Sequence, residues 1–125
     1  MIGQIRKVLT PFYDRKTGRM EIKSRPGLVI AAADSDDYVI LPVSKVSDQR
    51  RIDPEYDIKV DPSDFPNLSL NCVSYIRTHK QTVVHRASMG DMISNLKQHY
   101  EELYLTVLEK REQFSEEITR QALEE

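Results

Sequence analysis

The chain has 125 residues, of which 39% are hydrophobic and 30% charged, a composition typical of one globular domain with a well-solvated surface. Its formal net charge is only −2, which does not indicate a general nucleic-acid-binding protein. Residues 1–60 nevertheless hold eleven Lys/Arg against nine Asp/Glu, whereas residues 61–125 hold seven against eleven, so a local anion site in the first half is compatible with the overall balance.

Cys72 is the single cysteine, which excludes an internal disulfide and fits a reducing compartment. We expect it to be a small core residue rather than a nucleophile. No apolar run approaches the roughly 20 residues that span a bilayer, and the N-terminus lacks the apolar region of a signal peptide. The sequence therefore predicts a soluble cytoplasmic protein without a membrane partner.

Residues 3–10 predict a first strand that ends at Pro11, and residues 12–24 predict a long polar loop. This loop holds four basic residues, Arg15, Lys16, Arg19 and Lys23. A mobile basic loop with aromatic Phe12 at its root suits contacts with phosphates and stacked bases. An ordinary solvated hairpin tip is the simpler interpretation of the loop taken alone.

At Arg25-Pro26 the composition changes from polar to apolar, and a continuous apolar strand is predicted over residues 28–33. Because proline restricts the residue before it to extended geometry, Arg25 is expected at the mouth of a buried strand. A guanidinium in such a place is costly to desolvate and usually meets an anion. That anion is either a ligand or the internal partner of a salt bridge.

The acidic residues Asp34, Asp36 and Asp37 predict a turn rather than a metal site, because the loop lacks the length, glycine and distal glutamate of a calcium loop. No metal and no cofactor is expected. Residues 38–43 predict the second strand of a hairpin, and Ser44 stands where the chain leaves the sheet.

Further strands are predicted over residues 56–60, 68–77 and 82–85. From Asp91 the period changes, and apolar residues recur at helical spacing as Met92, Leu96, Tyr100, Leu103 and Val107. The fold class is therefore mainly β with C-terminal α: a small antiparallel β-barrel of six or seven strands over about residues 2–90, a helix over about 91–112 and an acidic helical tail over 113–125, all in one domain.

Four elements in this order resemble the MazF/PemK (also called Kid) family of toxins from type II toxin–antitoxin systems. They are the opening Gly3-Gln4-Ile5, the segment Arg25-Pro26-Gly27-Leu28-Val29-Ile30, the strand end Val39-Ile40-Leu41-Pro42-Val43-Ser44, and Ser74-Tyr75-Ile76-Arg77-Thr78-His79-Lys80, followed by Arg86-Ala87-Ser88-Met89-Gly90 before the helix. Ser44 stands where the family more usually has threonine.

The resemblance implies an SH3-like barrel, a homodimer and a metal-independent endoribonuclease that cuts single-stranded RNA and is neutralised by a cognate antitoxin protein. It implies that Arg25 and Ser44 are the catalytic pair and that Arg77 lies in the same groove. Predicted RNA contacts are Arg77, Thr78, His79, Lys23, Arg19 and Lys16.

The chemistry of these residues is compatible with this function. Cleavage of RNA without a metal can use the neighbouring 2′-OH as nucleophile and yields a 2′,3′-cyclic phosphate and a 5′-OH. A guanidinium can clamp phosphate oxygens and stabilise the charge that develops on them. Ser44 is expected to orient groups or relay a proton. Imidazole is the side chain best suited to acid–base work at neutral pH, so His79 and His85 are candidates, although the simpler interpretation of each is a strand-end or surface histidine; His79 is the one nearer to Arg77 in sequence.

Two other functions remain open from the sequence. The related CcdB group uses the same barrel to trap DNA gyrase through its terminal helix, and a barrel without catalysis could bind RNA or protein only. The arginines of the Arg25-Pro26 and Ile76-Arg77-Thr78 segments favour the nuclease, because a gyrase binder has no use for phosphate-clamping arginines.

Overall fold

Seven strands and five helical segments make up the chain in the computed structural model, which describes residues 1–124. They are β1 (Gln4–Asp14), β2 (Arg19–Ala32), β3 (Asp37–Ser44), η1 (Gln49–Arg51), β4 (Asp57–Val60), η2 (Pro66–Leu68), β5 (Ser74–Arg77), β6 (Thr82–His85), η3 (Arg86–Ser88), β7 (Met89–Asn95), α1 (Leu96–His99) and α2 (Glu101–Leu123).

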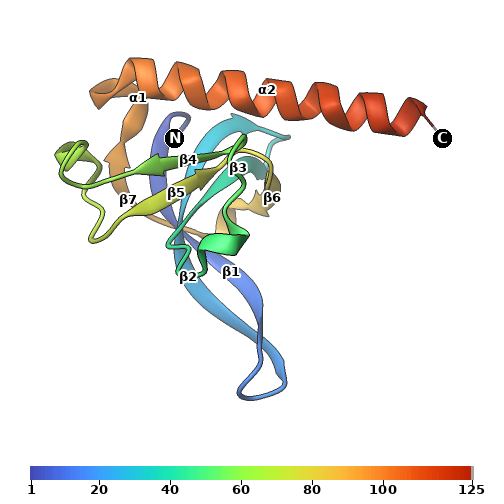
Figure 1. Cartoon of the computed structure of the whole chain (residues 1–125). Coiled ribbons are helices and arrows are strands. Elements are labelled where there is room, and N and C mark those ends of the chain that lie inside the picture. Colours follow the sequence, from blue (N-terminus) through green and yellow to red (C-terminus); the bar gives the residue numbers. More distant parts are fainter. Residues whose placement is uncertain (125) are drawn as a thin grey trace.

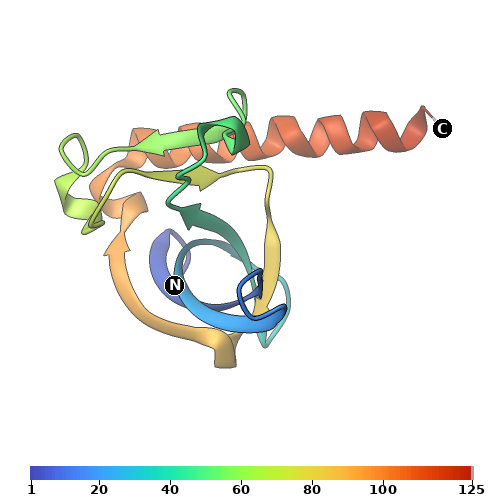
Figure 2. The ribbon, with the colours of Figure 1, turned by 60° about the horizontal axis from the view of Figure 1, so that its bottom comes forward.

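The strands form one antiparallel sheet in the order β4-β5-β3-β2-β1-β7, with β6 also paired to β3. Figure 2 shows this sheet curled on itself, with α2 lying across it. The predicted fold class, mainly antiparallel β with a long C-terminal helix, is confirmed as a half-barrel closed by α2 (Figure 1).

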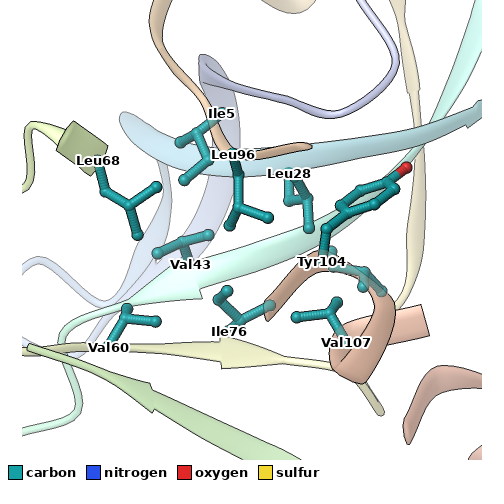
Figure 3. Close-up of a cluster of buried hydrophobic side chains, with 10 residues drawn as sticks. Ile5, Leu28, Val43, Val60, Leu68, Ile76, Leu96, Tyr104 and Val107 are labelled. Atoms are coloured by element: carbon teal, nitrogen blue, oxygen red, sulfur yellow. The ribbon is translucent and has the colours of Figure 1, made fainter. Parts of the chain in front are cut away.

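The main core fills the half-barrel beneath α2. Leu28 and Ile76 from the sheet and Tyr104 and Val107 from α2 are buried together, and this shared burial holds the helix on the sheet (Figure 3). A second, smaller cluster joins Val8, Val29 and Ile40. None of the helices within residues 1–124 is long and apolar enough to cross a membrane.

The long loop predicted over residues 12–24 was wrong, because only residues 15–18 form a turn, whereas the simpler interpretation as a hairpin tip is confirmed. β1 continues through Pro11 to Asp14 and pairs with β2 from Arg19, so the segment is a two-stranded arm that projects from the half-barrel (Figure 1). Beyond Val8, β1 has β2 as its only neighbour, and an edge position of this kind tolerates a proline.

The predicted helix start at Asp91 was also wrong. Residues Met89–Asn95 form β7, whose Ser94 and Asn95 pair with β1, and Asn95 then caps α1 by accepting a hydrogen bond from the Gln98 N–H at 3.0 Å. α2 begins at Glu101 and continues unbroken to Leu123, so no separate tail helix follows residue 112.

The strand predicted over residues 68–77 is shorter than expected. Only Ser74–Arg77 pairs as β5, while Pro66–Leu68 is a 3-10 helix. Ser69 then takes a left-handed conformation with φ of 56°, which interrupts any extended run through this segment.

Candidate functional site

A cavity of about 530 Å³ opens between the root of the β1–β2 arm and the strands β3 and β6. Its lining includes Arg25, Ser44 and Arg77, the three residues that the sequence assigned to one groove. The rest of the lining consists of Val8, Leu9, Thr10, Pro11, Pro26, Gly27, Ile40, Pro42, Lys80, Thr82, Val83, Val84, His85 and Ser88.

Gly27 is required where β2 passes this cavity. A Cβ at this position would lie 2.5 Å from Cγ2 of Ile40 and 3.1 Å from Cγ2 of Val8, closer than packed side chains tolerate. Because both neighbours belong to the small buried cluster, they have little room to move. The glycine therefore keeps the apolar wall intact next to Arg25.

Arg25 is the guanidinium that is free to meet an anion. It is half-buried, and within residues 1–124 its side chain takes part in no hydrogen bond or ion pair. Its Cζ lies 5.2 Å from the ring centroid of Phe12, on the same face of the arm, and this cation–π contact orients the side chain. The sequence left open whether the anion that meets Arg25 is a ligand or an internal salt-bridge partner. Because no such partner is present among the described residues, an anionic ligand is favoured.

Ser44 lies at the end of β3, opposite Tyr75 of β5, and is half-buried on the cavity wall. Its position follows from the register of β3 with β5, in which Arg77 lies two residues beyond Tyr75 and therefore on the same face as Ser44. An alcohol held there can accept or donate one hydrogen bond to a ligand.

Arg77 is largely committed to the protein itself. Its Nε donates to Oδ1 of Asp57 at 3.1 Å, and its Nη2 donates to Oδ2 of Asp57 at 3.2 Å and to the carbonyl oxygen of Arg51 at 2.9 Å. The Asp57 side chain is fully buried, while that of Arg77 is 18% exposed. Arg77 therefore lines the cavity with its positive charge already balanced, and a phosphate gains less from it than from Arg25.

Thr78 and His79 do not line this cavity. Thr78 is buried and donates its hydroxyl to the carbonyl oxygen of Tyr56 at 2.6 Å. The His79 ring packs against the rings of both Tyr56 and Phe114, and its centroid lies 6.0 Å from each of theirs. Both residues thus support the β4–β5 region and α2, and their predicted RNA contacts have no structural support.

The His79 environment disfavours its charged form. Burial lowers the pKa of His79 below 6.5, opposed by the nearby carboxylates of Asp57 and Asp53. Its Nδ1 is buried 3.7 Å from Oδ1 of Asp57 and makes no hydrogen bond within residues 1–124. This is the environment of a structural histidine beneath a helix rather than of a group that meets a substrate.

The basic residues of the arm also lie outside the cavity. Lys23 pairs in register with Thr10 and is exposed, while Arg19 forms an exposed ion pair with Glu21 at 3.2 Å. Lys16 lies in the turn at the tip of the arm. Any contact of Lys16, Arg19 or Lys23 with RNA would therefore lie outside the cavity.

Lys80 and His85 line the cavity and are absent from the site predicted by sequence. The signal for Lys80 was its place three residues after Arg77 in the same motif. His85 Nδ1 accepts a hydrogen bond from the Ala87 N–H at 3.0 Å, which leaves Nε2 as the ring nitrogen that can face a ligand. His85 thus replaces His79 as the histidine of the site.

The cavity is positively charged although the chain is not. Arg25, Arg77 and Lys80 line it, and no Asp or Glu among residues 1–124 does. Among residues 1–124, no three His, Cys, Asp or Glu side chains are grouped closely enough to hold a metal ion. The arrangement can bind an anion at Arg25, hold it beside a hydroxyl at Ser44, and donate hydrogen bonds to it from Lys80 and His85.

Comparison with models of known protein families gives no match for this chain, and comparison with curated proteins finds no relative. The motif resemblance to the MazF/PemK family therefore stays a prediction.

Proposed function

We propose that the protein is a toxin-type, metal-independent endoribonuclease that cleaves single-stranded RNA. The single observation that carries this proposal is that Arg25, free of internal partners among residues 1–124, shares one carboxylate-free cavity with Ser44 and Arg77. The motif resemblance suggests the type of reaction, which is metal-independent cleavage of RNA through the 2′-OH.

In the proposed reaction, the scissile phosphate binds Arg25. The 2′-oxygen attacks the phosphorus as its proton leaves, and the bond to the 5′-oxygen breaks as that oxygen takes up a proton. The products are a 2′,3′-cyclic phosphate and a 5′-OH, so atoms and charges balance without a co-reactant. Arg25 stabilises the doubly charged phosphorane, and such a preorganised donor contributes most where charge develops. Ser44 orients the 2′-OH or relays its proton, and Lys80 contacts a non-bridging oxygen.

The proposed partners come from the resemblance rather than from the cavity. They are single-stranded RNA, a second copy of the chain in a homodimer, and a cognate antitoxin protein that occupies the RNA groove. The dimer is checked by light scattering of the purified protein.

The test is incubation of the purified protein with a long RNA, with and without EDTA. We expect cleavage that survives EDTA, with products that carry a 2′,3′-cyclic phosphate by mass spectrometry. Arg25→Ala should lower the rate by about 10²–10³-fold, the usual effect of removing one donor to developing charge. Ser44→Ala should also lower the rate, whereas Ser44→Thr keeps the hydroxyl and should retain it.

Arg50→Ala is the matched control, because it removes the same charge from an exposed ion pair with Asp48 outside the cavity. It should leave the rate unchanged. An Arg25→Ala variant that cleaves like the unmodified protein would overturn the proposal, because the cavity would then play no part in the reaction.

A barrel that binds RNA without cleaving it is the second candidate. The observation that favours it is the pairing of Arg77 with Asp57, which leaves Arg25 as the one arginine of the cavity without an internal partner in the described part of the chain. RNA binding without cleavage would support this candidate. Neither binding nor cleavage, together with capture of DNA gyrase, would support a CcdB-like toxin.

A further inference from the structure

A second hollow of about 360 Å³ adjoins the first cavity and shares Arg25 and Pro26 with it. It is formed by the β1–β2 sheet, the end of β3 and the segment that precedes β5. Its remaining lining consists of Lys7, Ser24, Val43, Lys45, Ser69, Leu70, Asn71, Cys72, Ser74 and Ile93.

This hollow is also free of carboxylates. Lys7, Lys45 and Arg25 are its charged lining residues, and both lysines are exposed. Within residues 1–124, neither lysine makes a side-chain hydrogen bond or an ion pair. Lys7, Lys45 and Arg25 all lack a carboxylate partner among the described residues. Together they form a local positive surface in a chain whose net charge is −2.

The position of Arg25 links the two hollows. Its backbone lies opposite Val8 in the first cavity, and the adjacent Pro26 lies opposite Lys7 in the second. Lys45 follows Ser44 directly, so the end of β3 also contributes one residue to each hollow. Because successive side chains of a strand point to opposite faces, the two hollows lie on the two sides of β2. The pairing of β2 with β3 begins only at Gly27, so a chain of phosphates that meets Arg25 can reach the lysines by passing the edge of β2 beyond the end of β3.

We propose that single-stranded RNA continues past Arg25 into the second hollow, where Lys7 and Lys45 bind the next phosphate beyond the scissile one. The neighbouring side chains of Leu70 and Ile93 give that nucleotide an apolar wall. This inference rests on the proposed function, and it is tested by binding rather than by cleavage, so the two can fail separately.

Cys72 allows a direct test, because it is the single cysteine of the chain and lines the second hollow. The probe is a short single-stranded RNA of mixed sequence with 2′-O-methyl groups, which lacks the internal nucleophile. At saturation it should slow alkylation of Cys72 by iodoacetamide at least several-fold, as followed by mass spectrometry. A mononucleotide, long enough only for the first cavity, should leave the alkylation rate unchanged. An alkylation rate that the saturating RNA does not change would overturn the inference.

A double variant, Lys7→Gln with Lys45→Gln, gives the second measurement. Its affinity for the same RNA should fall about tenfold or more, and the slope of log affinity against log salt should decrease by about 0.7, the contribution of one neutralised phosphate of a single strand. Lys59→Gln is the matched control, because Lys59 is exposed on β4 and lines neither hollow. A double variant that binds like Lys59→Gln would overturn the inference.

The outcomes separate this inference from the proposed function. Cleavage of ordinary RNA without protection of Cys72 would overturn the strand path alone. Protection of Cys72 without any cleavage would overturn the nuclease and support the strand path. Failure of the RNA to bind at all would overturn both.

Discussion

At the scale of one residue, the buried His79 gives the clearest expected dependence of the free energy of unfolding on pH. Burial lowers its pKa in the folded chain below 6.5, the ordinary value that applies when the chain is unfolded. As the pH falls below about 6.5, the unfolded chain takes up a proton that the folded chain does not. The free energy of unfolding should therefore be constant above this pH, as far as His79 is concerned, and should decrease below it until the folded-state pKa is reached.

His79→Gln should remove this decrease, and the measurement is urea unfolding at a series of pH values between about 5 and 8, where histidine changes charge. His99→Gln is the control, because His99 is exposed and should leave the profile as it is. If the two variants give the same profile, the buried environment of His79 is not what sets the pH dependence.

The sequence predicted the surroundings of some residues and not of others. Pro26 and the apolar strand after it are local signals, and they placed Arg25 at the mouth of a strand. The pairing of Arg77 with Asp57 joins residues twenty positions apart through the β4–β5 register, and no local pattern encodes it. For the same reason, sequence proximity to Arg77 favoured His79, whereas pairing of β6 with β3 brings His85 to the cavity.

At the scale of elements, the role of α2 changes along its length. Its first turns bury Tyr104 and Val107, and Phe114 then packs edge-on against Tyr56 with ring centroids 5.0 Å apart. Beyond Phe114 the helix projects past the half-barrel, and residues 118–124 are exposed (Figure 1).

Phe114→Ala should lower the free energy of unfolding by about 2 kcal/mol, less than the 3–5 kcal/mol of a fully buried phenylalanine because Phe114 is only half-buried. A chain that ends at Ile118 should lose less than about 1 kcal/mol, because it gives up only exposed contacts such as those of Arg120 with Glu117 and Glu124. Denaturant unfolding measures both. A truncation as costly as Phe114→Ala would mean that the end of the helix packs against a partner, such as a second copy of the chain.

Several element boundaries were predicted well, and the strands expected over residues 82–85 and 56–60 are β6 (Thr82–His85) and β4 (Asp57–Val60). Residues 28–32 and 38–43 also belong to strands as expected, because a buried strand leaves an uninterrupted apolar run, although β2 begins earlier, at Arg19. At β7 the spacing of Met92, Leu96 and Tyr100 imitates one helical face, yet Met92 is half-exposed on a strand and Leu96 is buried at the start of α1. Pairing with β1 decides this boundary, and a non-local contact of this kind outweighs local periodicity.

At the scale of the whole molecule, the cationic and the acidic side chains lie in different regions. The chain has a net charge of −2, but the two hollows that meet at Arg25 have no acidic lining residue. The acidic residues of the described part of the chain lie elsewhere, including Glu112, Glu116 and Glu117 in the second half of α2 and Glu124 just after it. Association with RNA should therefore depend on the local surface and not on long-range attraction to the whole chain.

This separation predicts how binding responds to salt. Four cations of the two hollows have no internal partner among residues 1–124: Arg25, Lys80, Lys7 and Lys45. Arg25 and Lys80 meet the scissile phosphate, and Lys7 and Lys45 meet the next one. At about 0.7 per neutralised phosphate of a single strand, the slope is about −1.4, which is a loss of affinity of about 7-fold between roughly 50 and 200 mM salt. Fluorescence anisotropy with the 2′-O-methyl RNA measures this slope.

Arg25→Gln should reduce the magnitude of this slope by about 0.7, whereas Arg50→Gln should not change it, because Arg50 lies outside both hollows. Affinity that hardly responds to salt would contradict phosphate binding by these cations and would instead indicate that RNA is held by stacking on exposed apolar side chains such as Tyr13 of the arm.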